Sequence, residues 1–170
     1  MRRPLFWFIY LLLVIVQLLL NNYLRISPYL MVTILPVMVL CISIRVGTVG
    51  SMLIAFATGL VVDLLSEGLL GLNVAALVPV AFFRNGIIRL VFGTELFARN
   101  EDFSVQRNGF GKTALAVLIA QALFLLIYVW IDSAGMRPLS FDALRFAVSL
   151  VAGMLVSLLT LGLLAPDPRR

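Results

Sequence analysis

The 170-residue sequence contains no histidine, a single cysteine and few charged side chains. Without histidine, neither a Ser-His-Asp nor a Cys-His catalytic arrangement can be assembled, and the commonest metal ligand is missing. Cys41 cannot form a disulfide within the chain, so we interpret it as a small packing residue. We therefore expect no catalytic, cofactor-binding or metal-binding residues, and no enzymatic activity.

Only 12% of the residues are charged, whereas 62% are hydrophobic. Uncharged windows cover residues 4–24, 26–44, 46–62, 68–83, 113–131 and 146–166. Each is long enough, or nearly so, to cross the roughly 30 Å hydrocarbon layer as a helix that rises about 1.5 Å per residue. The sequence therefore predicts an all-α polytopic membrane protein.

We expect one integral membrane domain over residues 1–170, formed by a bundle of six transmembrane helices. The expected helices span about 4–20, 28–44, 47–65, 69–89, 113–131 and 141–165, and a cytoplasmic loop covers about 90–112. Proline removes a helical hydrogen bond, so Pro36 should kink the second helix. The first helix follows Arg2 and Arg3 but lacks a small-residue cleavage site, which predicts an uncleaved helix.

The positions of the basic residues predict the orientation of the bundle. If the N-terminus is cytoplasmic, ten of the 13 basic residues fall inside and only Arg25, Arg137 and Arg145 fall outside. This bias predicts that both termini are cytoplasmic. The net charge of +5 then reflects the orientation of the chain in the membrane. The basic residues would also be attracted to anionic lipid headgroups. No basic patch is interleaved with aromatic residues on a polar face, so we expect no binding to nucleic acid.

Two of the expected helices carry small residues at a spacing of four. They are Gly47, Ser51, Ala55 and Gly59 on the third helix, and Ser149, Gly153 and Ser157 on the sixth. Small residues at this spacing allow the backbones of two helices to approach closely in lipid. The pattern is typical of packing within the bundle, but it would also suit docking of a helix from another protein.

Polar side chains interrupt the apolar runs near the outer ends of three helices. Gln17, Asp63 and Asn73 fall at one depth in the predicted outer leaflet, and Gln121 lies deeper. These positions predict a polar patch or pocket that opens to the outer face.

Asp63 needs a partner, because a carboxylate near a helix C-terminus faces the negative end of the helix dipole. A tight turn brings the start of the next helix alongside, where N–H groups lack helical partners. Gly68 and Gly71 would let that backbone approach. Our first hypothesis is that Asp63 caps this helix, together with Asn73, and locks the hairpin. A contact with a partner protein or ligand, and a role in proton or ion transport, remain alternatives.

The same hairpin carries a family resemblance. The run Gly59-Leu-Val-Val-Asp63 followed by Leu-Leu-Ser-Glu-Gly-Leu-Leu-Gly71-Leu-Asn73 resembles the central signature of the rod shape-determining protein MreD family. Upstream, Gln17-Leu-Leu-Leu-Asn21, then Ser27-Pro28-Tyr29 and Pro36 are similar to that family's first two helices. The resemblance covers nearly the whole chain. Its 59–73 motif is moderately specific, and the remainder is mostly apolar.

The resemblance implies a non-enzymatic scaffold of the bacterial cell-elongation machinery in the cytoplasmic (inner) membrane. Its expected partners are an MreC-like bitopic protein with a periplasmic coiled coil, MreB-type filaments and the cell-wall synthases that make peptidoglycan. The implied helical arrangement is similar to substrate-capture subunits of energy-coupling-factor transporters. A small-molecule (vitamin-type) capture subunit of a transporter is therefore the second hypothesis, but the outer loops offer few of the aromatic and hydrogen-bonding groups that such a pocket needs.

Overall fold

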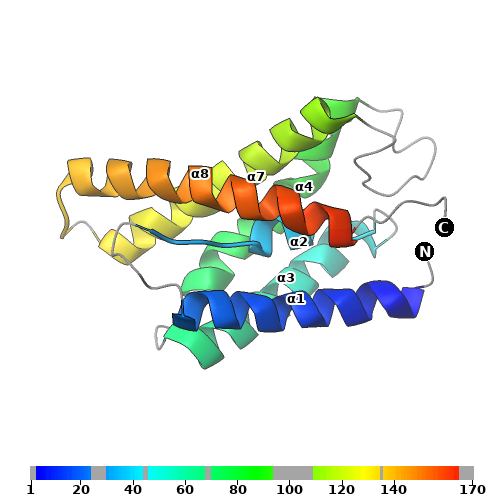
Figure 1. Ribbon diagram of the computed structural model, residues 1–170, viewed down its shortest axis with the longest axis horizontal. Coiled ribbons are helices and arrows are strands. Elements are labelled where there is room, and N and C mark those ends of the chain that lie inside the picture. Colours follow the sequence, from blue (N-terminus) through cyan, green and yellow to red (C-terminus); the bar gives the residue numbers. More distant parts are fainter. Residues whose placement is uncertain are drawn as a thin grey trace.

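The protein is a bundle of helices (Figure 1). The computed structural model describes residues 3–23, 30–43, 46–67, 70–93, 109–134 and 136–164, and within them the chain forms helices and turns but no strands. The elements in chain order are α1 (Arg3–Tyr23), α2 (Leu35–Leu40), α3 (Gly47–Val62), the π-helical turn η2 (Asp63–Glu67), α4 (Leu72–Phe92), α7 (Phe110–Ser133) and α8 (Leu139–Leu164).

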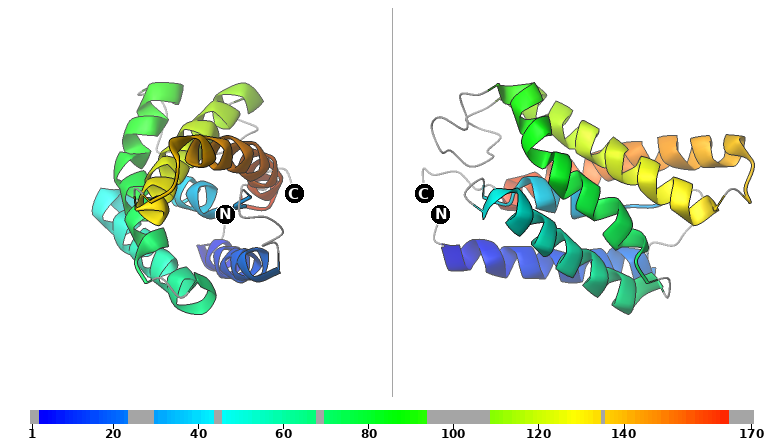
Figure 2. Two further views of the ribbon diagram at one scale, coloured as in Figure 1. Left: turned by 90° about the vertical axis from the view of Figure 1, so that its left-hand side faces the viewer. Right: turned by 180° about the vertical axis from the view of Figure 1, so that it is seen from behind.

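Five of these helices are long and apolar enough to cross a membrane, which makes the chain a multi-pass membrane protein. They are α1, α3 with its continuation η2, α4, α7 and α8. The helices α1, α3 and α7 run in one direction, whereas α4 and α8 run in the other (Figures 1 and 2). The starts of α1, α3 and α7 therefore lie at the same end of the bundle as the ends of α4 and α8. This alternation is compatible with the predicted placement of both termini on one side.

The prediction of a continuous second helix over 28–44 is wrong for most of its described part. Residues 30–34 are not helical, and α2 covers only Leu35–Leu40. Pro36 lies in the first turn of α2, so it begins the helix instead of kinking its middle. One more helical turn before α2 would need a Pro36 N–H and would press the proline ring against the carbonyl of Val32. Residues 24–29 and 44–45 lie outside the described part of the chain.

The other predicted helices are present with somewhat different ends. The third expected helix continues past Val62 as η2, and the fourth begins at Leu72 instead of about residue 69. Helix α7 begins at Phe110 and α8 at Leu139, a few residues before their expected starts. Most of the expected cytoplasmic loop, residues 94–108, lies outside the described residues.

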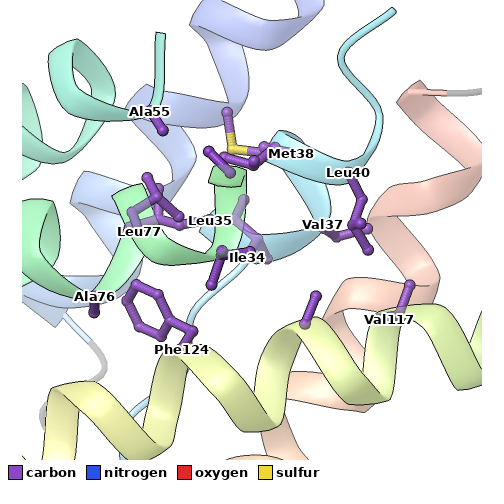
Figure 3. Close-up of a cluster of buried hydrophobic side chains, with 14 of the residues drawn as sticks. Ile34, Leu35, Val37, Met38, Leu40, Ala55, Ala76, Leu77, Val117 and Phe124 are labelled. Atoms are coloured by element: carbon purple, nitrogen blue, oxygen red, sulfur yellow. The ribbon is translucent and has the colours of Figure 1, made fainter. Parts of the chain in front are cut away.

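The short helix α2 is the centre of the hydrophobic core. All six of its residues are buried, and the side chains of Leu35, Val37, Met38, Val39 and Leu40 are fully inaccessible. Figure 3 shows α2 surrounded by Ala55 of α3, Ala76 and Leu77 of α4, and Val117 and Phe124 of α7. Because α4, α7, α8 and α1 all contact α2, its position determines how these helices are spaced.

Gln17 of α1 supplies partners for the non-helical backbone that precedes α2. Its Oε1 accepts a hydrogen bond from the N–H of Ile34 (2.8 Å), and its Nε2 donates to the carbonyl of Val32 (3.2 Å). Gln17 is fully buried. Irregular backbone inside a membrane protein is tolerated only where other groups satisfy its N–H and C=O. One side chain of α1 therefore provides two of the bonds that an α-helix would have made for itself.

Side chains of α7 and α8 form hydrogen bonds with the backbone at the other edge of residues 30–34. Gln121 of α7 donates to the carbonyl of Thr33 (3.2 Å), and Ser149 of α8 accepts from the N–H of Met31 (3.0 Å). Gly153 makes room for this arrangement, because a Cβ at that position would overlap the Gln121 side-chain nitrogen. Three helices thus converge on one unwound segment.

Arg84 of α4 forms hydrogen bonds with the backbone at the C-terminal end of α2. Its guanidinium donates to the carbonyl of Leu40 (3.3 Å) and to the carbonyl of Ile42, and the side chain is fully buried. A positive charge is favourable at the C-terminus of a helix, where carbonyls lack helical donors. Both ends of the six-residue α2 are therefore completed by side chains of other helices.

We predict that Gln17→Leu destabilises the protein by about 2–4 kcal/mol, because two buried backbone groups would lose their partners. Gln121→Leu removes one such bond and should cost about half as much. Thermal unfolding of the purified protein in detergent measures both effects.

The matched control is Asn22→Leu, a change from amide to leucine at an exposed position of α1. We expect it to leave the midpoint of unfolding nearly unchanged. Equal midpoints for Gln17→Leu and Asn22→Leu would show that Gln17 does not support residues 30–34.

Candidate functional site in the hairpin of α3 and α4

Asp63 is fully buried at the end of α3, where η2 begins. Its Oδ1 accepts hydrogen bonds from the backbone N–H and the side-chain Nδ2 of Asn73, both at 2.9 Å. Its Oδ2 accepts from the N–H of Gly71 (3.0 Å) and the N–H of Val74 (3.2 Å). The carboxylate therefore satisfies the first N–H groups of α4 from the neighbouring helix.

This geometry is the cap that the sequence predicts. The first turn of a helix has N–H groups without helical acceptors and a partial positive charge, which together favour an anion. Gly71 precedes α4 with a φ of 97°, a left-handed conformation that glycine adopts at little cost. The turn thereby aims the N–H groups of Gly71, Asn73 and Val74 at one carboxylate. Gly68 lies outside the described residues.

Gly59 brings the two helix backbones together one turn before the cap. A Cβ on Gly59 would lie 2.9 Å from both the Cα and the N of Val74, closer than real side chains approach a backbone. Any larger residue would push α3 away from α4 and lengthen the hydrogen bonds to Asp63. Gly59, Asp63, Gly71 and Asn73 thus form one structural unit, although they are spread over residues 59–73.

The prediction that these polar residues form a patch open to the outer face is wrong. Gln17, Asp63 and Asn73 are each fully buried, so they do not open to the outside. They do lie near one end of the bundle: the Gln17 Nε2 donates to Asn21 Oδ1 (2.7 Å), and Asn21 Nδ2 donates to Ser66 Oγ in η2 (3.3 Å). The reason for their burial is that each binds backbone or side-chain groups that would otherwise be unsatisfied in an apolar core.

The small residues on the third helix have separate roles. Ser51 and Ala55 are buried, and Ala55 lies in the core beside α2. Gly47 does not pack against another helix: it is exposed, and a Cβ there would meet nothing within 4 Å. Its φ of 73° shows why glycine stands there, since the chain must turn into α3.

The small residues on α8 face the inside of the bundle. Ser149, Gly153 and Ser157 are buried, and the first two accommodate the backbone of Met31 and the side chain of Gln121. These contacts are packing within the bundle. They occupy the face that docking of an outside helix would have used.

Two groups of polar side chains that join helices were not predicted from the sequence. Arg84 is one of the ten basic residues that the sequence places on the cytoplasmic side, and its position inside the expected helix 69–89 is a signal that it binds backbone. Asp132 at the end of α7 forms ion pairs with Arg137 (3.0 Å) and Arg145, which join the α7–α8 hairpin at the end opposite to Arg84. The Arg145 guanidinium also lies over the Tyr128 ring, 6.0 Å from its centroid.

The hydrogen bonds of Asp63 show a structural role in the hairpin. The oxygens of Asp63 are occupied by N–H donors, and no other ionisable side chain donates to or accepts from them among the described residues. Within those residues, no group of three or more His, Cys, Asp or Glu is placed to hold a metal ion. Comparisons with models of known families, with curated proteins and with solved structures found no match.

We predict that Asp63→Asn is less damaging than Asp63→Leu. Asparagine retains one acceptor oxygen and so can keep part of the cap, whereas leucine leaves several buried N–H groups unsatisfied at about 1–3 kcal/mol each. The yield of folded, monodisperse protein and its unfolding midpoint in detergent should therefore fall in the order wild type, Asp63→Asn, Asp63→Leu. An equal loss in both variants would indicate that the negative charge, and not the hydrogen bonding, is essential.

Proposed function

We propose that this chain is a non-enzymatic membrane scaffold of the bacterial cell-elongation machinery. In this role it binds an MreC-like bitopic protein and helps to organise peptidoglycan synthesis and rod shape from the inner membrane. The supporting observation is that the four matching positions of the MreD-like motif meet in one hairpin. Asp63 accepts hydrogen bonds from Gly71 and Asn73, and Gly59 lets the two helix backbones approach. The hairpin geometry therefore explains why these residue types stand at these four positions.

The proposed orientation places both termini in the cytoplasm. It is supported by the basic residues at the helix ends: Arg89 in the last turn of α4 and Lys112 in the first turn of α7 lie at one end of the bundle. Basic residues near short loops favour the cytoplasmic side. In this orientation the capped hairpin of α3 and α4 and the hairpin of α7 and α8 both face the periplasm.

A scaffold fits the buried polar residues better than a vitamin-type capture subunit does. The second hypothesis drew on a polar patch open to the outside, and the three residues of that patch are instead buried and hydrogen bonded within the protein. A capture site needs polar groups directed at a ligand. Gln17 and Asp63 are instead directed at backbone N–H groups of this chain, and Asn73 donates to Asp63.

The proposal is tested by affinity purification of the tagged full-length chain from its own membranes in mild detergent. We expect a bitopic coiled-coil protein to co-purify, and depletion of the chain to convert rod-shaped cells to spheres. Recovery of a bound vitamin without such a partner would contradict the proposal and support the capture subunit.

The Asp63→Asn variant separates the two roles left open for Asp63. If the residue is a structural cap, the amount of partner recovered per folded chain should equal that of the wild type. A drop of tenfold or more per folded chain, with normal unfolding, would make Asp63 a direct contact with the partner.

A further inference from the structure

The hairpin of α7 and α8 extends beyond the other helices at one end of the bundle. Figure 1 shows the end of α7 and the start of α8 at the left, past the end of α1 and the start of α4, and the right-hand view in Figure 2 shows the same arrangement from behind. We call residues 130–134 and 136–145 the hairpin tip. It contains Asp132 and its two ion-pair partners, Arg137 and Arg145.

The surface of the hairpin tip is rich in apolar side chains. Met136 is 91% exposed, Leu139 is 79% exposed and Trp130 is 73% exposed. Exposure of large apolar side chains to water is unfavourable, and a surface that stands in water more often carries charged or amide groups at such positions. The composition of the tip therefore indicates that something other than water surrounds it.

The lipid-facing side of α8 continues into the hairpin tip. Four exposed residues follow one another at spacings of three and four and so share one side of the helix: Leu144, Val148, Val151 and Leu155. This side stays apolar where α8 enters the tip, because Leu144 is the neighbour of the ion-paired Arg145. The apolar surface therefore has no boundary at the point where the hairpin leaves the bundle.

The length of α8 agrees with a tip at headgroup depth. Leu139–Leu164 has 26 residues, which span about 39 Å at about 1.5 Å per residue. The hydrocarbon layer is about 30 Å thick, and the bilayer with its headgroups is about 40–45 Å thick. Residues 158–164, at the other end of α8, carry no charge and suit the hydrocarbon layer. The excess length of about 9 Å then falls at the tip, within the headgroup layer.

Arg137 presents a positive charge on the surface of the hairpin tip. Its side chain is 43% exposed, whereas those of Asp132 and Arg145 are 15% and 12% exposed. The remaining acid of the tip, Asp142, is only partly exposed. Arg137 donates to Asp132 through Nη1, and a guanidinium has five N–H donors in all. The outward charge of the tip is therefore complementary to a phosphate, which arginine binds with paired N–H groups.

We propose that the hairpin tip lies in the phospholipid headgroup layer, with Met136 and Leu139 against the upper acyl chains and Arg137 beside a lipid phosphate. Trp130 fits the same depth, because a tryptophan ring favours the membrane interface, where one side is apolar and its N–H can reach polar groups. The bilayer surface is thus the partner that covers the tip. This inference depends neither on the proposed function nor on which side of the membrane the tip faces.

The test measures the depth of the hairpin tip in nanodiscs, in which both faces of the bilayer are accessible. Trp7→Phe with Trp130→Phe removes both tryptophans of the chain, and a single probe is then introduced as Met136→Trp or as Leu139→Trp. The control probe, Leu155→Trp, lies on the lipid-facing side of α8 within the bilayer. Each variant is reconstituted in lipids brominated either near the headgroup or near the end of the acyl chain, and is also titrated with the water-soluble quencher acrylamide.

We expect bromine near the headgroup to quench both tip probes about twofold more than bromine near the chain end, and Leu155→Trp to show the reverse preference. Acrylamide should quench the tip probes about half as strongly as it quenches free tryptophan amide. Equal acrylamide quenching of the tip probes and the free amide would place the tip in water and overturn the inference. Stronger quenching by the deep bromine would overturn it too, as would protection from both quenchers, since protein would then cover the tip.

A change of charge tests the phosphate contact. Arg137→Glu is combined with the Met136→Trp probe and compared in nanodiscs of phosphatidylglycerol and of phosphatidylcholine. We expect acrylamide quenching to be about twofold higher in the anionic lipid, because the carboxylate is repelled from a negative surface. Arg137→Gln should give equal quenching in the two lipids. Equal quenching of Arg137→Glu would refute the position of Arg137, and misfolding cannot mimic the expected result because one variant is compared in two lipids.

Photo-crosslinking in living cells distinguishes lipid from a protein that covers the hairpin tip. A benzophenone amino acid at Met136 should form adducts with lipid, and its yield of crosslinked protein should not exceed that of the same group at Leu155. Capture of one protein at Met136 about tenfold above the Leu155 control would assign the tip to that protein and would overturn the inference.

Discussion

The absence of water in the hydrocarbon layer is the constraint on which this structure depends. Every N–H and C=O group at membrane depth must find a partner within the protein, and most do so inside a helix. Where a helix begins or ends inside the bundle, side chains of other helices supply the partners. Asp63 accepts hydrogen bonds from the N–H groups at the start of α4. Gln17 and Gln121 bind the backbone that precedes α2, and Arg84 binds the carbonyl of Leu40 at the end of α2.

These bonds also determine the arrangement of the helices. A hydrogen bond to a backbone group fixes the distance between two helices more narrowly than apolar packing does. Helix α1 is joined to α3 by the hydrogen bond between Tyr10 Oη and Thr58 Oγ1 (3.0 Å), and to residues 30–34 by Gln17. Each such bond relates two segments far apart in sequence, so the irregular stretch before α2 acts as a connection among α1, α7 and α8.

The sequence predicts much of this fold because apolar runs and glycine spacing are local signals. The five long helices follow from uncharged windows, and the cap on α4 follows from an acid one turn before a glycine-rich hairpin. The broken second helix was missed because residues 26–44 are as apolar as any helix here. Pro36 alone could not reveal that Gln17 and Ser149 complete the unwound backbone, since those contacts join residues 15 or more positions apart. For the same reason, the burial of Gln17 could not be predicted.

The central claim is that side chains of neighbouring helices satisfy backbone groups at the two interrupted sites. Amide hydrogen exchange of the purified protein, resolved to single residues by NMR in detergent micelles, tests it most directly. The account predicts that the N–H groups of Met31, Ile34, Asn73 and Val74 exchange as slowly as those in the middle of α7. Exchange of these four amides at the rate of an unprotected loop would contradict it.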